Sequence, residues 1–129
     1  MTRLEHLNVT VPNADATAAT LCDLFGWRVR WSGTVLEGAG RSVHVGEASN
    51  GGTYLALYSP KDGTAAAPDS YATARGLNHV ALIVDDLDAM DAKVRAAGYV
   101  PGSHAAYEPG RRFYFDGPDG IEFELVSYG

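Results

Sequence analysis

The sequence has almost no cysteine, no long apolar run and no cluster of basic residues. Cys22 is the only cysteine among 129 residues, which excludes an intrachain disulfide. The N-terminal MTRLEHLNVT lacks the apolar core of a signal peptide, and no apolar run approaches the length of a membrane span. Only Arg111 and Arg112 are adjacent among ten basic residues, and the net charge is −6, which argues against a nucleic-acid partner. We therefore expect a cytoplasmic protein that binds neither membranes nor nucleic acids.

The length and composition fit one compact domain. Hydrophobic residues make up 46% of the chain and charged residues 20%, as is ordinary for a globular protein. A chain of this length buries roughly two-thirds of its unfolded surface on folding, so no metal or disulfide is needed merely to fold. Residues 1–129 are therefore predicted to form a single domain.

The chain repeats its order of elements. The stretch LEHLNVTV (4–11) returns in altered form as LNHVALIV (77–84), and both alternate as strands do, with a histidine at the third place. A helical stripe of apolar residues follows over 14–25, and WRVRW, SVHV and TYLALY then indicate three strands. The second half has a helical stripe over 87–97, then strand-like RRFYF, the turn DGPDG and strand-like IEFELV. Each half is predicted to run strand, helix and about three strands.

This order predicts an α+β fold of two βαβββ modules. Module 1 spans about 1–60 and module 2 about 76–129, with a polar linker of small residues at about 61–75. One such module cannot bury its sheet face alone. We expect the two modules to form a rolled mixed sheet, a cup, with the helices on the outside.

Aligning the two halves indicates a metal site. His6 aligns with His79, and TYLALYS aligns with IEFELVS, which sets Glu124 opposite Ala56. Strand alternation places both histidines and Glu124 on the face away from the helices. Two imidazoles and one carboxylate are a typical ligand set for a divalent metal with open coordination positions, and Fe, Mn, Ni and Zn all remain possible.

The same alternation predicts further residues inside the cup. An arginine and several tyrosines could orient an anionic or aromatic substrate; the alternative is that they are solvated strand or rim residues. The predicted substrate-binding residues are Asn8, Tyr54, Tyr58, Arg112 and Tyr114. His44 could act as an acid or base, although a surface position is the simpler interpretation. His104 lies in an expected loop, PGSHAAYEPG, and Glu122 is expected towards the rim.

The motifs EHLNVTVPN, LNHVALIVDD and YFDGPDGIEFELVS together resemble the vicinal oxygen chelate superfamily, which includes glyoxalase I, extradiol dioxygenases and bleomycin-binding proteins. The resemblance covers essentially the whole chain. It implies a metal held inside the cup by His6, His79 and Glu124. The position of Ala56 carries a fourth ligand in glyoxalase I, and alanine cannot coordinate, so a three-ligand site is expected.

Two functions follow from this resemblance. The first is a metal-dependent enzyme, dioxygenase-like or glyoxalase-like, whose small oxygenated substrate chelates a divalent metal. The alternative is a metal-free protein that binds and sequesters a small molecule, as bleomycin-resistance proteins do. Many small members build each cup from two chains, so a homodimer with shared sites is also expected.

Overall fold

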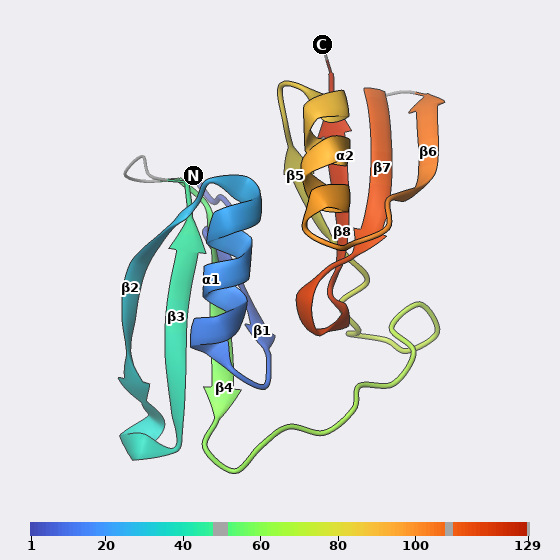
Figure 1. Ribbon diagram of the computed structural model, residues 1–129. Coiled ribbons are helices and arrows are strands. Elements are labelled where there is room, and N and C mark those ends of the chain that lie inside the picture. The colour runs from blue at the N-terminus through green and yellow to red at the C-terminus, as the bar shows by residue number, and fades with distance from the viewer. Residues whose placement is uncertain (48–51, 108–109, 129) are drawn as a thin grey trace. The chain divides into compact units, whose positions relative to one another are not determined.

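The computed structural model describes residues 1–47, 52–107 and 110–128, and it divides the chain into two compact units, Met1–Ala66 and Ala67–Gly129. Each unit contains one helix lying against a four-stranded mixed sheet (Figure 1). In the part of the chain that is described, no helix is long and apolar enough to cross a membrane.

The first unit has the sheet order β1-β4-β3-β2, with β1 parallel to β4 and the other pairs antiparallel. Asn13 caps the helix by accepting a hydrogen bond from the backbone amide of Ala16, and Gly26 ends it in the left-handed conformation. The helix buries Leu21 and Leu24 against the sheet. The elements are β1 (His6–Thr10), α1 (Ala14–Phe25), β2 (Arg28–Val35), the short 3₁₀ helix η1 (Leu36–Gly38), β3 (Gly40–Gly46) and β4 (Tyr54–Pro60).

The second unit repeats this arrangement with the sheet order β5-β8-β7-β6, in which β5 is parallel to β8. Its core contains Phe113, Phe123 and Leu125, none of which is exposed to solvent. The elements are β5 (Val80–Ile83), α2 (Leu87–Ala96), β6 (Gly102–Tyr107), β7 (Gly110–Asp116), η2 (Pro118–Gly120) and β8 (Glu122–Ser127). The predicted α+β fold of two βαβββ modules is therefore confirmed.

The strand register agrees with the alignment of the two halves. Asn8, two residues after His6, pairs with Ala56 in β4, and Ala81, two residues after His79, pairs with Glu124 in β8. Ala56 and Glu124 therefore occupy equivalent places in the two sheets. His6 pairs with Tyr54, and the corresponding position beside His79 belongs to Glu122.

Two segments differ from the expectation. The first is the expected loop PGSHAAYEPG, of which residues 102–107 form strand β6, paired with β7 through a bulge between Gly102 and Ala105. Its small residues and flanking Gly and Pro hide the apolar alternation that marks a strand. The second is the linker, which forms turns over residues 69–76 and brings Tyr71 to the site described below.

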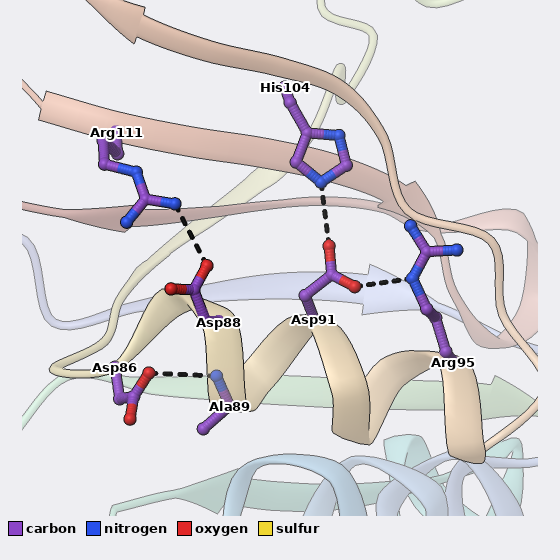
Figure 2. Close-up of polar contacts among 7 residues, drawn as sticks. All are labelled: Asp86, Asp88, Ala89, Asp91, Arg95, His104 and Arg111. Atoms are coloured by element: carbon purple, nitrogen blue, oxygen red, sulfur yellow. Dashed lines mark hydrogen bonds and ion pairs between the residues drawn. The ribbon is translucent and has the colours of Figure 1, made fainter.

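The helix-covered side of the sheet in the second unit carries a set of ion pairs (Figure 2). Asp91 on α2 lies 2.6 Å from Nε of Arg95 and 2.8 Å from Nε2 of His104 on β6. These hydrogen bonds, from Arg95 first and then His104, lower the pKa of Asp91. Asp88 pairs with Arg111 at 3.0 Å. His104 therefore lies against helix α2 and does not cover the opposite face of the sheet.

Candidate metal centre

The structure brings together two of the three predicted metal ligands. His79 immediately precedes β5, and Glu124 lies on the neighbouring strand β8. Nε2 of His79 is 3.2 Å from Oε1 of Glu124, and the two side chains are 31% and 9% exposed. Glu124 is nearly buried, which is unusual for a carboxylate without a function or a partner.

This distance fits a pair of metal ligands. Bonds of roughly 2.0–2.2 Å from a divalent cation to a histidine nitrogen and a carboxylate oxygen hold the two atoms about 3.0 Å apart at a right angle and about 3.4 Å apart at the tetrahedral angle that Zn²⁺ adopts. The observed 3.2 Å between Nε2 of His79 and Oε1 of Glu124 lies between these values. The nitrogen and oxygen donors also suit Fe, Mn, Ni or Zn.

The second oxygen of Glu124 contacts an arginine. Nη1 of Arg112 on β7 donates a hydrogen bond to Oε2 of Glu124 at 3.0 Å, and both side chains are 9% exposed. Arg112 shares the face of Glu124, as the alternation predicted. The guanidinium supports the carboxylate and leaves its Oε1 directed at His79, an arrangement typical of groups that orient a ligating carboxylate.

A cavity of about 470 Å³ adjoins His79 within the second unit. The ring of Tyr114, a predicted substrate residue, meets the ring of His79 edge-on at 5.5 Å between centroids. Arg112, predicted to bind substrate, is not among the residues that line this cavity, whose acidic groups are Asp116 and Glu122. The lining residues are Tyr71, His79, Val100, Gly102, Ser103, Tyr114, Phe115, Asp116 and Glu122.

Sequence reasoning missed Tyr71 and set Glu122 aside. The Tyr71 hydroxyl donates a hydrogen bond of 2.6 Å to Oε1 of Glu122 and lies 3.3 Å from Nδ1 of His79. The hydrogen bond to Glu122, followed by burial and the charge of Glu122, raises the pKa of Tyr71 to about 12. The only local feature of the sequence that points to a turn at Tyr71 is Asp69, whose side chain accepts a hydrogen bond from the backbone amide of Tyr71.

The first unit holds a row of aromatic rings beside His6. Its ring stacks on Tyr54 at 4.8 Å between centroids, Tyr54 stacks on His44 at 4.7 Å, and Trp31 lies 5.0 Å from His44. Nδ1 of His6 is 2.9 Å from Oε1 of Glu5, which also accepts from the Tyr54 hydroxyl at 3.3 Å. The hydrogen bond with His6, and then that with Tyr54, lowers the pKa of Glu5.

His44 lies beside His6 in this row. The two rings stack with 6.4 Å between centroids. Burial, and then the positive charges of His6 and Arg30, lower the pKa of His44. A lowered pKa keeps an imidazole neutral near pH 7, which is the form that accepts a proton.

The remaining predicted residues lie on β1 and β4. Asn8 is exposed on β1, two residues from His6. Tyr58 lies four residues beyond Tyr54 on β4, and its ring covers Gly40, where any larger side chain would overlap it. Across residues 1–47, 52–107 and 110–128, no three or more His, Cys, Asp and Glu side chains are gathered closely enough to hold a metal ion. The complete triad of His6, His79 and Glu124 stays a prediction.

Comparison with known proteins identifies the family. Residues 3–125 match the Glyoxalase/Bleomycin resistance protein/Dioxygenase superfamily. The chain therefore belongs to this superfamily. No curated protein matches the chain in sequence.

Solved structures share the fold at low identity. The trypanothione-dependent glyoxalase I of Leishmania major is 22% identical, with a TM-score of 0.82 over 99% of this chain and 88% of that one. TnmS3, an antibiotic-binding protein of Streptomyces sp. CB03234, is 19% identical, with a TM-score of 0.75 over 98% and 96%. A mutant of FosX, the fosfomycin-resistance protein of Listeria monocytogenes, solved with Mn(II) and a dihydroxypropylphosphonic acid, is 20% identical, with a TM-score of 0.73 over 100% and 94%.

Proposed function

We propose that this protein is a metal-dependent enzyme acting on a small oxygenated substrate that chelates a divalent metal. The observation that carries the proposal is the contact between the nearly buried Glu124 and the half-buried His79, whose Oε1 and Nε2 lie 3.2 Å apart. Superfamily membership supports it, because FosX was solved with Mn(II). In this proposal His6 supplies the third ligand.

When bound, the metal would supply Lewis-acid stabilisation of charge on a substrate oxygen. The chain's own residues would hold and orient the reactants. The buried methyl group of Ala56 cannot coordinate, so a triad leaves positions open for two substrate oxygens. Tyr114 beside His79 and Tyr54 beside His6 flank the proposed ligands, and the neutral imidazole of His44 is placed to take up a proton.

The second candidate function is metal-free binding of a planar small molecule. The aromatic row of Trp31, His44, Tyr54 and His6 favours it, since stacked rings suit flat ligands. TnmS3, a binding protein with this fold, supports the same alternative. The two functions differ in whether His6 and His79 bind a cation.

Metal content separates the two functions. Protein prepared without chelators or a histidine tag is expected to contain about one equivalent of Fe, Mn, Ni or Zn per chain, because a built ligand set retains its metal. Elemental analysis measures this directly, and dialysis against a chelator should remove the metal. Metal-free protein that also fails to bind added cations would contradict the enzyme proposal.

We also propose a homodimer in which each site draws ligands from both chains. Under this proposal, His6→Ala and Glu124→Ala variants each lose metal binding. Mixing them after subunit exchange should restore about a quarter of the sites, because half of the dimers are mixed and one site in each of these is intact. Equilibrium metal titration of the mixture measures the recovery. No recovery, despite mass-spectrometric proof of mixed dimers, would place all ligands within one chain.

A further inference from the structure

The strand β2 contains a bulge at Arg30. In the register of β2 with β3, Val29 pairs with Val45 and Trp31 pairs with His44. Arg30 is therefore the extra residue of the bulge. A regular strand would place the side chains of Arg30 and Trp31 on opposite faces of the sheet. A bulge redirects side chains, so both can reach the same face.

Arg30 lies over the aromatic row of the first unit. The central carbon of its guanidinium, Cζ, is 5.0 Å from the centre of the Tyr54 ring, and its Nη1 donates a hydrogen bond of 2.8 Å to the carbonyl oxygen of Gly52. The positive charge of Arg30 also contributes, after burial and the charge of His6, to the lowered pKa of His44. The guanidinium therefore belongs to the same face as the stacked rings.

Arg30 differs from the paired arginines of this chain. It is half-buried, yet no carboxylate of the described residues lies within ion-pair distance of it. A guanidinium has five N–H donors, of which the Gly52 carbonyl takes one. Such a group favours a planar anion, which it binds through two parallel hydrogen bonds. The arginines that do pair with a carboxylate are Arg41, Arg95, Arg111 and Arg112.

The charges around Arg30 also favour an anionic ligand. Arg30 lines a cavity of about 570 Å³ in the first unit, together with Arg3 and Glu5. Oε1 of Glu5 is already engaged by Nδ1 of His6 at 2.9 Å and by the Tyr54 hydroxyl at 3.3 Å. Among the described residues, two cationic side chains and one partnered carboxylate therefore line this cavity, although the net charge of the chain is −6.

Trp31 supplies a flat apolar surface on the same face. Its ring is tilted by 49° against that of His44, at 5.0 Å between centroids, and the residue is 48% exposed. The ring lies over Gly33, where an added methyl group would come within 2.9 Å of it. A half-exposed indole on the same face as a guanidinium fits a ligand that is both planar and anionic.

We infer that Arg30 and Trp31 form a binding site for a flat aromatic acid, in which Arg30 holds the carboxylate and the aromatic ring stacks on Trp31. The inference names a class of ligand for the proposed function, and it rests on that function only in so far as this ligand is the substrate. Binding by these two residues needs no metal ion, so it can be tested on metal-free protein.

Two probes of the same shape test the role of the charge. Naphthoate carries a carboxylate, and naphthamide replaces it with a neutral amide. In isothermal titration of chelator-treated protein, naphthoate is expected to bind roughly 10–100-fold more tightly than naphthamide, because hydrogen bonds to charged groups are the stronger ones. Equal affinity for the two probes, or no binding of naphthoate at millimolar concentration, would overturn the inference.

Substitutions test the two residues separately. Arg30→Met is expected to weaken naphthoate binding roughly 10–100-fold and to leave naphthamide binding nearly unchanged, which also shows that the variant is folded. Trp31→Ala should weaken binding of both probes roughly 10-fold, since a stacked aromatic pair contributes beyond the apolar area that it buries. The matched controls are Arg28→Met, an exposed arginine of the same strand, and Tyr128→Ala, an exposed tyrosine of the second unit, and neither should change the binding of either probe.

The outcomes separate this inference from the proposed function. Unchanged naphthoate binding in Arg30→Met would overturn the inference, and the metal content of the wild type would still decide the proposed enzyme function. A wild type that binds no cation but binds naphthoate through Arg30 would contradict the enzyme function and support the inference, and the chain would then be a binding protein for aromatic acids.

Discussion

Replacing Glu124 with glutamine is expected to weaken divalent-metal binding by more than about 100-fold, the upper end of the losses seen when a group that only orients a ligand is removed. Glu124 is the sole anion in the predicted ligand set, and its Oε1 faces Nε2 of His79. Glutamine has nearly the same shape and still accepts a hydrogen bond from Arg112, but it leaves the buried charge of Arg112 uncompensated, so a loss of about 3–5 kcal/mol in stability is expected beside the loss of metal binding. Isothermal titration, or competition with a chromophoric chelator, measures the change in dissociation constant.

The control is Glu47→Gln, which removes the same charge from an exposed position outside the site. It is expected to leave metal affinity unchanged, because a fully solvated charge is largely screened. Circular dichroism should confirm that both variants remain folded. Equal metal affinity in Glu124→Gln and the wild type would mean that Glu124 is not a ligand, and the proposed metal centre would have to be abandoned.

The fold was predictable because each half shows its own periodicity. The local signals are the alternating stretches around His6 and His79 and the apolar stripes of the two helices. Because both halves show these signals in the same order, each half supports the prediction made for the other. Strand β6 was not predictable in this way, since its central residues His104, Ala105 and Ala106 do not alternate between apolar and polar. Pairing with β7 determines its conformation, and such pairing is a tertiary effect.

The site was predictable in part, for a similar reason. Strand alternation placed Glu124 and Arg112 on one face, and the structure shows them in contact, but alternation alone did not reveal that Arg112 is buried against the carboxylate. Tyr71 could not be found, because it lies in a polar segment without periodicity and reaches His79 only through the fold. Glu122 contacts the site through its hydrogen bond with Tyr71, so its place beside His79 was missed together with Tyr71.

Replacing Arg112 with methionine is expected to destabilise the metal-free protein by about 3–5 kcal/mol, since removing one partner of a buried ion pair leaves the other charge uncompensated. Glu124 is the partner, its Oε2 lies 3.0 Å from Nη1 of Arg112, and both side chains are 9% exposed. Urea unfolding with the metal removed measures the loss. The double variant Arg112→Met/Glu124→Leu should recover most of this stability, because no charge then remains buried.

Added metal ions test whether the Glu124 carboxylate that pairs with Arg112 also binds the metal. A cation bound by Glu124 compensates its charge, and binding to the folded state alone adds about 2.7 kcal/mol at a concentration 100 times the dissociation constant. Added metal should therefore stabilise Arg112→Met substantially and should not stabilise the double variant, which lacks the ligand. Equal stabilisation of the two variants would show that the metal binds elsewhere. A stable, metal-free Arg112→Met would show that solvent reaches Glu124 and that the carboxylate does not depend on a neighbouring cation.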